Sequence, residues 1–316
     1  MQSKINILIP AYNDWDALTL LLDRIEATTN HLPYQIVCTV VNDGSNLEYP
    51  SEKFRKYKIE VIHLMRNVGH QKAIAIGLAH LAEKGGFDKV IVMDADGEDR
   101  PEDIEKLVAV SEKEPNKIVF AQRQKRSEGF IFRTFYIIYR FIFDMLTGKT
   151  ITFGNFCLIP QSKVRNIAFV SEIWNNFPGG VIRSKLPYTS VPIDRGTRLA
   201  GKSQMNFVSL VLHGMSTISV FLDATAVRIM LFSILMITFS SLGIFTVIYF
   251  KFVLEMATPG WASSLASGFF IIMLQGFFIS LFMVFTVLSY RSNKHFIPLL
   301  DYKPFIERIE ENRQEI

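Results

Sequence analysis

The segment Lys89-Val-Ile-Val-Met-Asp-Ala-Asp-Gly97 is the most informative part of the sequence, because a short apolar run ends there directly in two carboxylates. Similar apolar runs lie on both sides of it, and stretches with helical spacing separate them. The predicted strands cover residues 5–10, 36–41, 59–64, 89–93 and 117–121, and the predicted helices cover 14–29, 69–84 and 101–112. Strands that alternate with helices indicate βαβ units, and therefore an α/β fold with a mostly parallel sheet flanked by helices.

Polar residues directly follow three of the predicted strands, at Asn13-Asp14, at residues 42–45 and at Asp94-Ala95-Asp96. In open α/β sheets, ligands bind at the carboxyl ends of the strands. Two carboxylates one residue apart suit a hard divalent cation such as Mg²⁺ or Mn²⁺, and Glu98 offers a third ligand or a partner for a metal-bound water. The alternative is a polar turn that only caps the helix at Pro101. Asp43-Gly-Ser is likewise an ordinary turn sequence when taken alone.

The composition excludes several classes of protein. The 316 residues are 49% hydrophobic and 20% charged, which is incompatible with a disordered chain. The net charge of +4 is small and the sequence contains no long basic run, so no nucleic-acid partner is expected. Cys38 and Cys157 lie in apolar surroundings, and we expect both to be small core residues.

Two long stretches carry no Asp, Glu, Lys or Arg: Ile229–Phe250, with 22 residues, and Met256–Tyr290, with 35. Each exceeds the ~20 apolar residues that cross a bilayer, so we predict two transmembrane helices at about 229–250 and 267–289. Thr258-Pro-Gly260 punctuates the sequence before the second. The alternative is a pair of buried helices in a large soluble core.

The charges around these spans predict their orientation. Arg228, Arg291 and Lys294 flank them, whereas the intervening loop holds one Lys and one Glu. The positive-inside rule then places the N-terminal domain and both termini in the cytoplasm, on the inner (cytoplasmic) membrane of the cell. No signal peptide is expected, because the N-terminal sequence passes straight into a strand. The predicted divisions are a domain at 1–205, a juxtamembrane segment at 206–226, the hairpin at 227–290 and a tail at 291–316, helical near its end.

The juxtamembrane segment has apolar residues at helical spacing, with Ser209, His213, Ser216 and Ser219 between them. This pattern predicts an amphipathic helix that lies in the membrane interface. A third membrane span is the alternative.

Four motifs occur in a fixed order, each after a predicted strand: Pro10-Ala-Tyr-Asn-Asp14, Val41-Asn-Asp-Gly-Ser45, Arg66-Asn-Val-Gly69 with Lys72 and Gly77, and Met93-Asp-Ala-Asp-Gly97. Together they resemble the family-2 glycosyltransferases with a GT-A (Rossmann-like) fold, over about residues 3–205. The resemblance implies that Pro10, Tyr12, Asp14, Asp43, Lys72 and Asp94 bind the nucleotide. It also implies that Asp94 and Asp96 are metal ligands that bridge to the diphosphate.

The C-terminal part resembles one group of that family. Processive synthases carry Gln-x-x-Arg-Trp, and no Trp of this chain follows an Arg. Instead, Gly154-Asn-Phe-Cys-Leu158, the basic stretch from Arg195 to Ser203 and two membrane helices are similar to the polyisoprenyl-phosphate glycosyltransferases. That group includes dolichol-phosphate mannose synthase and bacterial undecaprenyl-phosphate hexosyltransferases.

The basic stretch is expected to hold the acceptor phosphate, through Arg195, Arg198, Lys202 and Ser203. Guanidinium groups can grip phosphate with two hydrogen bonds, and the stretch lies just before the interfacial helix. The alternative is an electrostatic anchor for anionic lipid headgroups. Arg123 and Arg133 flank a loop that, by the resemblance, also meets phosphates.

Asn155 stands where several relatives have Asp. A phosphate monoester has its second pKa near ~6, so the acceptor is already mostly deprotonated at neutral pH and needs no base. Asn155 is therefore expected to position the acceptor or the sugar, with activity retained.

These features predict an inverting transfer of one hexose from a nucleotide sugar, UDP-linked rather than GDP-linked, to a polyprenyl phosphate for cell-envelope glycans. The alternatives are another lipid acceptor or a catalytically impaired, nucleotide-binding membrane scaffold. Self-association of the hairpin through Gly268 and Gly276 is a further expectation.

Overall fold

The computed structural model describes residues 3–123, 140–201, 207–255, 260–293 and 295–312. The chain divides into two compact units. The first comprises Met1–Thr134, Ile151–Val220 and His295–Ile316, and the second comprises Phe135–Thr150 and Phe221–Lys294.

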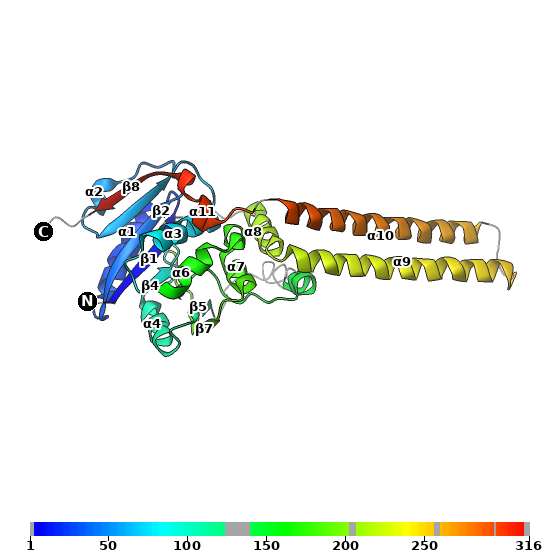
Figure 1. Ribbon diagram of the computed structural model, residues 1–316, viewed down its shortest axis with the longest axis horizontal. Helices are drawn as coiled ribbons and strands as arrows, with labels where there is room; N and C mark the ends of the chain where they lie inside the picture. The colour runs from blue at the N-terminus through cyan, green and yellow to red at the C-terminus, as the bar shows by residue number, and fades with distance from the viewer. Residues whose placement is uncertain (1–2, 124–139, 202–206, 256–259, 294, 313–316) are drawn as a thin grey trace. The chain divides into compact units, whose positions relative to one another are not determined.

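A single sheet forms the centre of the first unit (Figure 1). Its described strands are β1 (Ser3–Ala11), β2 (Tyr34–Asn42), β3 (Ile59–Leu64), β4 (Lys89–Val92), β5 (Ile118–Arg123), β6 (Cys157–Pro160), β7 (Tyr188–Ile193) and β8 (Ile306–Asn312). The strand order is β7-β5-β6-β4-β1-β2-β3-β8. Strands β6 and β8 run antiparallel to their neighbours and the others are mutually parallel. The predicted α/β fold with a mostly parallel sheet is confirmed.

Helices cover both faces of the sheet. From the N-terminus to residue 219, the described helices of this unit are α1 (Trp15–Thr29), α2 (Ser51–Phe54), α3 (His70–Lys84), η1 (Pro101–Asp103), α4 (Ile104–Lys113), α6 (Gln161–Ala168), η2 (Ser171–Trp174), α7 (Phe177–Ser184) and α8 (Phe207–Ser219). Residues of β1 alternate between two cores: Ile5, Ile7 and Ile9 pack with α1 and α4, whereas Leu8 packs with α3, α6 and α7. This alternation follows from the two-residue period of a strand. Cys38 and Cys157 are buried in these cores, as expected.

Gly77 explains how closely α3 approaches the sheet. A Cβ atom at this position would lie 2.4 Å from Cδ1 of Leu8 and 2.9 Å from Cγ2 of Val41. Because those atoms belong to fully buried side chains, only glycine allows the helix to pack at this depth.

The prediction that the tail is helical near the C-terminus is wrong. After a short helix, α11 (Pro298–Asp301), and a 3-10 turn, η3 (Lys303–Phe305), the chain forms β8 against the edge of β3. Leu299 and Tyr302 are buried in the core beside α3. The charged side chains of β8 are mostly exposed, as is common for an edge strand. Because these charges replace the usual apolar residues of a strand, the sequence pattern does not predict β8.

The second unit contains two long antiparallel helices, α9 (Leu222–Phe252) and α10 (Trp261–Ser292), of 31 and 32 residues. Their most apolar windows have mean hydropathies of 2.2 and 2.4, and only 17% and 6% of those windows are buried within the described structure. Helices of a soluble core would be mostly buried. The predicted spans at 229–250 and 267–289 lie inside these longer helices.

The contact between α9 and α10 repeats every seven residues. On α9 the buried positions include Ala226, Ser233, Ser240 and Val247. On α10, Gly276 lies against Ile237 and the carbonyl oxygen of Ser233, so a Cβ there would come within 2.9 Å of the isoleucine. The expectation that Gly276 serves contacts between copies is therefore wrong, because Gly276 already packs against α9 of its own hairpin. Nothing lies within 4 Å of a Cβ at Gly268.

A chain of buried polar groups crosses the α3 face of the sheet. Asn6 donates to Thr39 (3.0 Å), Thr39 donates to Glu60 (3.3 Å), and Lys84 donates to Glu60 (2.6 Å). Glu60 also lies 3.1 Å from Nε2 of His80 and is only 5% exposed. Burial acts to raise the pKa of Glu60, but the hydrogen bonds and charges of His80 and Lys84 outweigh it and lower the pKa to about 2.

This lowered pKa predicts a pH dependence of stability. The stabilisation is fully present above the unfolded value near 4.5 and is lost as the pH falls towards 2, up to roughly 3 kcal/mol. We expect Glu60→Gln to flatten the decline of the melting temperature of the detergent-solubilised protein between pH 5 and 2. Glu26→Gln, an exposed change on α1, is the control. Equal slopes for wild type and Glu60→Gln would contradict the prediction.

Candidate active site

The polar segments singled out in the sequence meet at one edge of the sheet. The parallel strands β1, β2, β3, β4, β5 and β7 all end there, and the antiparallel strand β6 begins there. This geometry brings Asp14, Asp94, Arg123 and Asn155 from four separate segments to the same edge.

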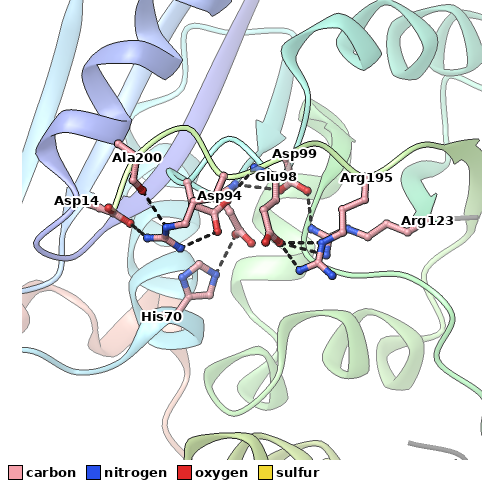
Figure 2. Close-up of polar contacts among 10 residues, drawn as sticks. Asp14, His70, Asp94, Glu98, Asp99, Arg123, Arg195 and Ala200 are labelled. Atoms are coloured by element: carbon pink, nitrogen blue, oxygen red, sulfur yellow. Dashed lines mark hydrogen bonds and ion pairs between the residues drawn. The ribbon is translucent and has the colours of Figure 1, made fainter. Parts of the chain in front are cut away.

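Asp94 is held by residues from α3 and from the segment before β6. Its Oδ1 lies 3.0 Å from Nε2 of His70, the first residue of α3 (Figure 2). Asn155 places Nδ2 3.0 Å from the same His70 nitrogen, and its Oδ1 accepts a hydrogen bond from Gln71 (3.1 Å). Gln71 in turn accepts a hydrogen bond from the backbone N–H of Phe177 (2.6 Å). The α3 N-terminus thus fixes both Asp94 and Asn155.

The carboxylates of the loop after β4 repel one another. Burial, and then the charge of Asp94, raise the pKa of Asp99 to about 7 and raise the pKa of Asp96 above its ordinary value. Burial also acts to raise the pKa of Asp94, but His70 and then Arg123 bring it below its ordinary value. The pKa of His70 is raised, because Asp94 and Asp99 outweigh the effect of burial.

Two arginines offset the negative charge of Glu98 and Asp99 in this loop. Arg123 donates from Nη2 to Oδ1 of Asp99 (2.9 Å), and its Nη1 lies 3.8 Å from Glu98. Arg195 donates to Oε2 of Glu98 from Nε (3.0 Å) and Nη2 (2.6 Å). In this structure the Glu98 carboxylate is therefore turned towards arginines, and its predicted role as a metal ligand would require it to leave them.

The segment that follows β7 lies along the acidic loop. Leu199 donates its backbone N–H to Asp96 O (2.9 Å), and Gly196 donates to Glu98 O (2.8 Å). Gly97 has φ +82°, and a Cβ there would lie 2.3 Å from Cγ of Leu199, so this contact requires glycine.

Arg198 is the central cation of that segment. It bonds Asp14 from Nη2, donates to Oδ2 of Asp96 from Nη1 (3.2 Å) and donates to Ala200 O from Nε (3.0 Å) (Figure 2). The structure thus places Arg198 between the first-strand motif and the acidic loop. Arg133, Lys202 and Ser203 lie outside the described residues.

Asp43 has partners that the sequence did not indicate. It is 3% exposed, and its two oxygens accept the backbone N–H groups of Val68 (2.7 Å) and Gly69 (2.9 Å). A carboxylate at the N-terminus of α3 also interacts favourably with the helix dipole. Asp43 therefore anchors the loop before α3, and its base-binding role remains a prediction.

The other predicted nucleotide residues surround the end of β1. Pro10 is a buried residue of β1, and the Tyr12 hydroxyl accepts a hydrogen bond from Asn46 (3.3 Å). A cavity of about 370 Å³ opens beside Asp14. Its lining includes Asn13, Leu47, Pro50, Ala200 and Gly201. Lys72 lies elsewhere, with Nζ 5.4 Å from the ring centroid of Trp174.

Sequence reasoning missed His70, Gln71 and Asp99. His70 and Gln71 directly follow Arg66-Asn-Val-Gly69, a position that offers them to the strand edge, and Asp99 lies inside the acidic loop. Their roles depend on contacts with β5, β6 and α7, which no local pattern shows.

The acidic loop has the chemistry of a divalent cation site. Asp94 and Asp96 supply hard oxygen donors, and the charge of Asp94 adds to burial in raising the pKa values of Asp96 and Asp99. Within the described residues, no three His, Cys, Asp or Glu side chains are gathered as a metal-ligand group. A cation held by these two carboxylates would need further oxygen ligands, as a nucleotide diphosphate supplies.

Comparisons with solved structures show the fold. The chain is similar to glucosyl-3-phosphoglycerate synthase from Mycobacterium tuberculosis, solved with Mn²⁺, UDP-glucose and phosphoglyceric acid. The TM-score is 0.51 at 15% identity, over 71% of this chain and 80% of that one.

Two curated relatives are similar in sequence. An undecaprenyl-phosphate 4-deoxy-4-formamido-L-arabinose transferase from Klebsiella pneumoniae is 26% identical over 225 residues, which cover 66% of this chain and 64% of the relative. The uncharacterized glycosyltransferase YkcC of Bacillus subtilis is 27% identical over 271 residues, 82% of this chain and 80% of the relative.

A further comparison shows the family. Residues 6–174, more than half of the chain, match Glycosyl transferase family 2, and they contain the strand-end motifs and the acidic loop described above. The chain belongs to glycosyltransferase family 2 and is a glycosyltransferase.

Proposed function

We propose that this protein transfers one hexose from a nucleotide sugar to a polyprenyl phosphate at the cytoplasmic face of the membrane. The observation that carries the proposal is the pairing of an acidic, cation-compatible loop with Arg123, Arg195 and Arg198 in a chain that also has a long apolar hairpin. Both substrates of such a reaction carry phosphate groups, and arginine binds phosphate with directed pairs of hydrogen bonds. The similarity to a transferase named for undecaprenyl phosphate supports the acceptor class.

The reaction needs charge stabilisation more than proton transfer. An acceptor phosphate oxygen attacks the anomeric carbon, the bond from that carbon to the nucleoside diphosphate breaks, and the configuration inverts. A Mg²⁺ or Mn²⁺ ion held by Asp94 and Asp96 supplies charge neutralisation for the departing diphosphate. Because the acceptor is already a dianion at neutral pH, an amide at position 155 suffices. Gln71 holds that amide in place, so Asn155 can orient the acceptor or the sugar.

The exposed apolar face of helix α8 is consistent with a catalytic unit that works at a membrane surface. Asn176, at the start of α7, donates to Thr217 of α8 (3.0 Å), which fixes one face of the helix to its unit. Val211, Leu212 and Met215 are 44–61% exposed and lie on another face. An exposed apolar face on a helix that precedes the hairpin suits the membrane interface. Arg228 and Arg291 at the hairpin ends support a cytoplasmic location of those ends in the inner membrane.

The transfer itself is the first test. The full-length protein in detergent, with Mg²⁺ or Mn²⁺, is incubated with undecaprenyl phosphate and each of a panel of radiolabelled UDP- and GDP-sugars. We expect labelled lipid from one donor, UDP-linked, and a loss of at least about 100-fold on chelation and in Asp96→Ala. Absence of product with every donor, while nucleotide still binds to the folded protein, would contradict the proposed acceptor.

Arg198→Ala tests which of the two phosphate-containing substrates Arg198 binds. Removing a charge-assisted contact of this kind should lower kcat/KM by roughly 10- to 100-fold, and Arg198→Lys should recover part of it. A rise in KM for the lipid alone supports the acceptor role, whereas a rise for the nucleotide sugar alone assigns Arg198 to the donor diphosphate. The control is Arg24→Ala, which removes an ion pair between Arg24 of α1 and Glu102 of η1. Unchanged kinetics would exclude Arg198 from both sites.

Asp43→Ala tests whether Asp43 anchors the loop before α3 or only binds the nucleotide base. The loss of two buried hydrogen bonds to a carboxylate should cost about 1.5–3 kcal/mol and lower the melting temperature by several degrees. The exposed Asp16→Ala is the matched control. An unchanged melting temperature together with a raised KM for the nucleotide sugar would instead support base binding alone.

A further inference from the structure

Gln275 is a polar residue in the middle of an apolar helix. It is the fifteenth of the 32 residues of α10, so at 1.5 Å per residue about 20 Å of helix lies on either side. Its side chain is exposed, and it forms no hydrogen bond with any residue in the described part of the chain. In a membrane-spanning hairpin this depth is hydrocarbon, where an amide without a hydrogen-bond partner is strongly unfavourable.

The hairpin cannot satisfy Gln275 by itself. Helix α10 meets α9 through Phe269, Met273 and Gly276, which contact Gly243, Ser241 and Ile237. At 100° per residue, Gln275 lies about 100° to 160° around α10 from these three residues, so it points away from that seam.

Exposed residues at a spacing of 3.5 form a continuous stripe through Gln275. The stripe comprises Ser264, Gly268, Ile271, Gln275, Phe278, Phe282, Phe285 and Ser289, and every member is exposed. Successive members are separated by four and three residues in alternation, which is the pattern of a helix-packing seam. Near the loop end the members are small, and nothing lies within 4 Å of a Cβ at Gly268, so another helix can approach closely there.

We propose that this α10 stripe is a contact surface between two copies of the chain, with the two Gln275 amides hydrogen-bonded to each other. A carboxamide carries both a donor and an acceptor, so it is complementary to a second copy of itself across a twofold axis. Every copy enters the membrane with the same orientation, which brings identical side chains to the same depth. A polyprenyl or acyl chain has no donor or acceptor and leaves the amide unsatisfied. A single polar residue inside an apolar seam also fixes its register.

Cysteine crosslinking of full-length protein in native membranes tests the surface. Ile271→Cys and Phe278→Cys lie on the stripe, one turn to either side of Gln275. The matched controls Phe270→Cys and Phe277→Cys are 51% and 55% exposed at the same depths on another face. Two differently tagged copies are co-expressed and oxidised with copper phenanthroline. The native Cys38 and Cys157 are buried, and the parent chain measures their background. We expect disulfide-linked dimers containing both tags from the stripe variants and none above background from the controls.

Gln275→Leu tests the amide itself. In the Ile271→Cys background it should weaken dimerisation by about 3- to 20-fold, measured as loss of crosslinked product on dilution into lipid vesicles. Phe277→Leu, at nearly the same depth but off the stripe, should leave dimerisation unchanged. Leucine suits a membrane helix, so loss of the crosslink does not reflect failure to insert.

The inference rests on the membrane hairpin of the proposed function, and its failure is distinguishable from failure of that function. Extraction with alkaline carbonate reports insertion, and the transfer assay reports activity. Equal crosslinking at stripe and control positions, or no effect of Gln275→Leu, would overturn the pairing of two copies even in an inserted, active protein. A crosslinked product that contains one tag and a different polypeptide would also overturn it.

Discussion

The repulsion among the carboxylates of the loop after β4 is the constraint around which the site is built. Asp94, Asp96, Glu98 and Asp99 fall within six residues at the end of a buried strand. Three other segments compensate them: α3 through His70, β5 through Arg123, and the segment after β7 through Arg195 and Arg198. Three parts of the chain distant in sequence are thus held to one loop by opposite charge.

The same balance explains how a ligand can be accommodated. The three arginines that neutralise this loop are also the groups best suited to bind phosphates. In the proposed reaction a divalent cation and a diphosphate would bring charges of both signs, so they could replace the internal ion pairs at Asp96 and Glu98 without leaving a charge unpaired. The segment from residue 194 to 201, docked through backbone hydrogen bonds and Leu199, is the element most directly affected by such an exchange.

The chain leaves the sheet unit after Val220 and returns to it at His295. The returning residues complete the sheet with β8 and bury Leu299 and Tyr302 beside α3, the helix whose N-terminus holds Asp94 and Asn155. Trp174, which lies under Lys72, also packs against Phe296, with ring centroids 3.9 Å apart. The segment after the hairpin is therefore part of the catalytic unit and not a separate tail.

The α/β alternation, the mostly parallel sheet, the two long apolar helices and the chemical nature of the acidic loop could all be predicted from the sequence. These properties are local: apolar runs, helical spacing and a strand followed by carboxylates are written in consecutive residues. Other features could be seen only in the folded chain: Asp43 anchors a loop, Glu98 faces two arginines, Gly276 packs inside the hairpin, and charged residues near the C-terminus form an edge strand. Each of these depends on which distant segment lies opposite, because a carboxylate, a glycine or a charged strand has no fixed role until its partner is in place.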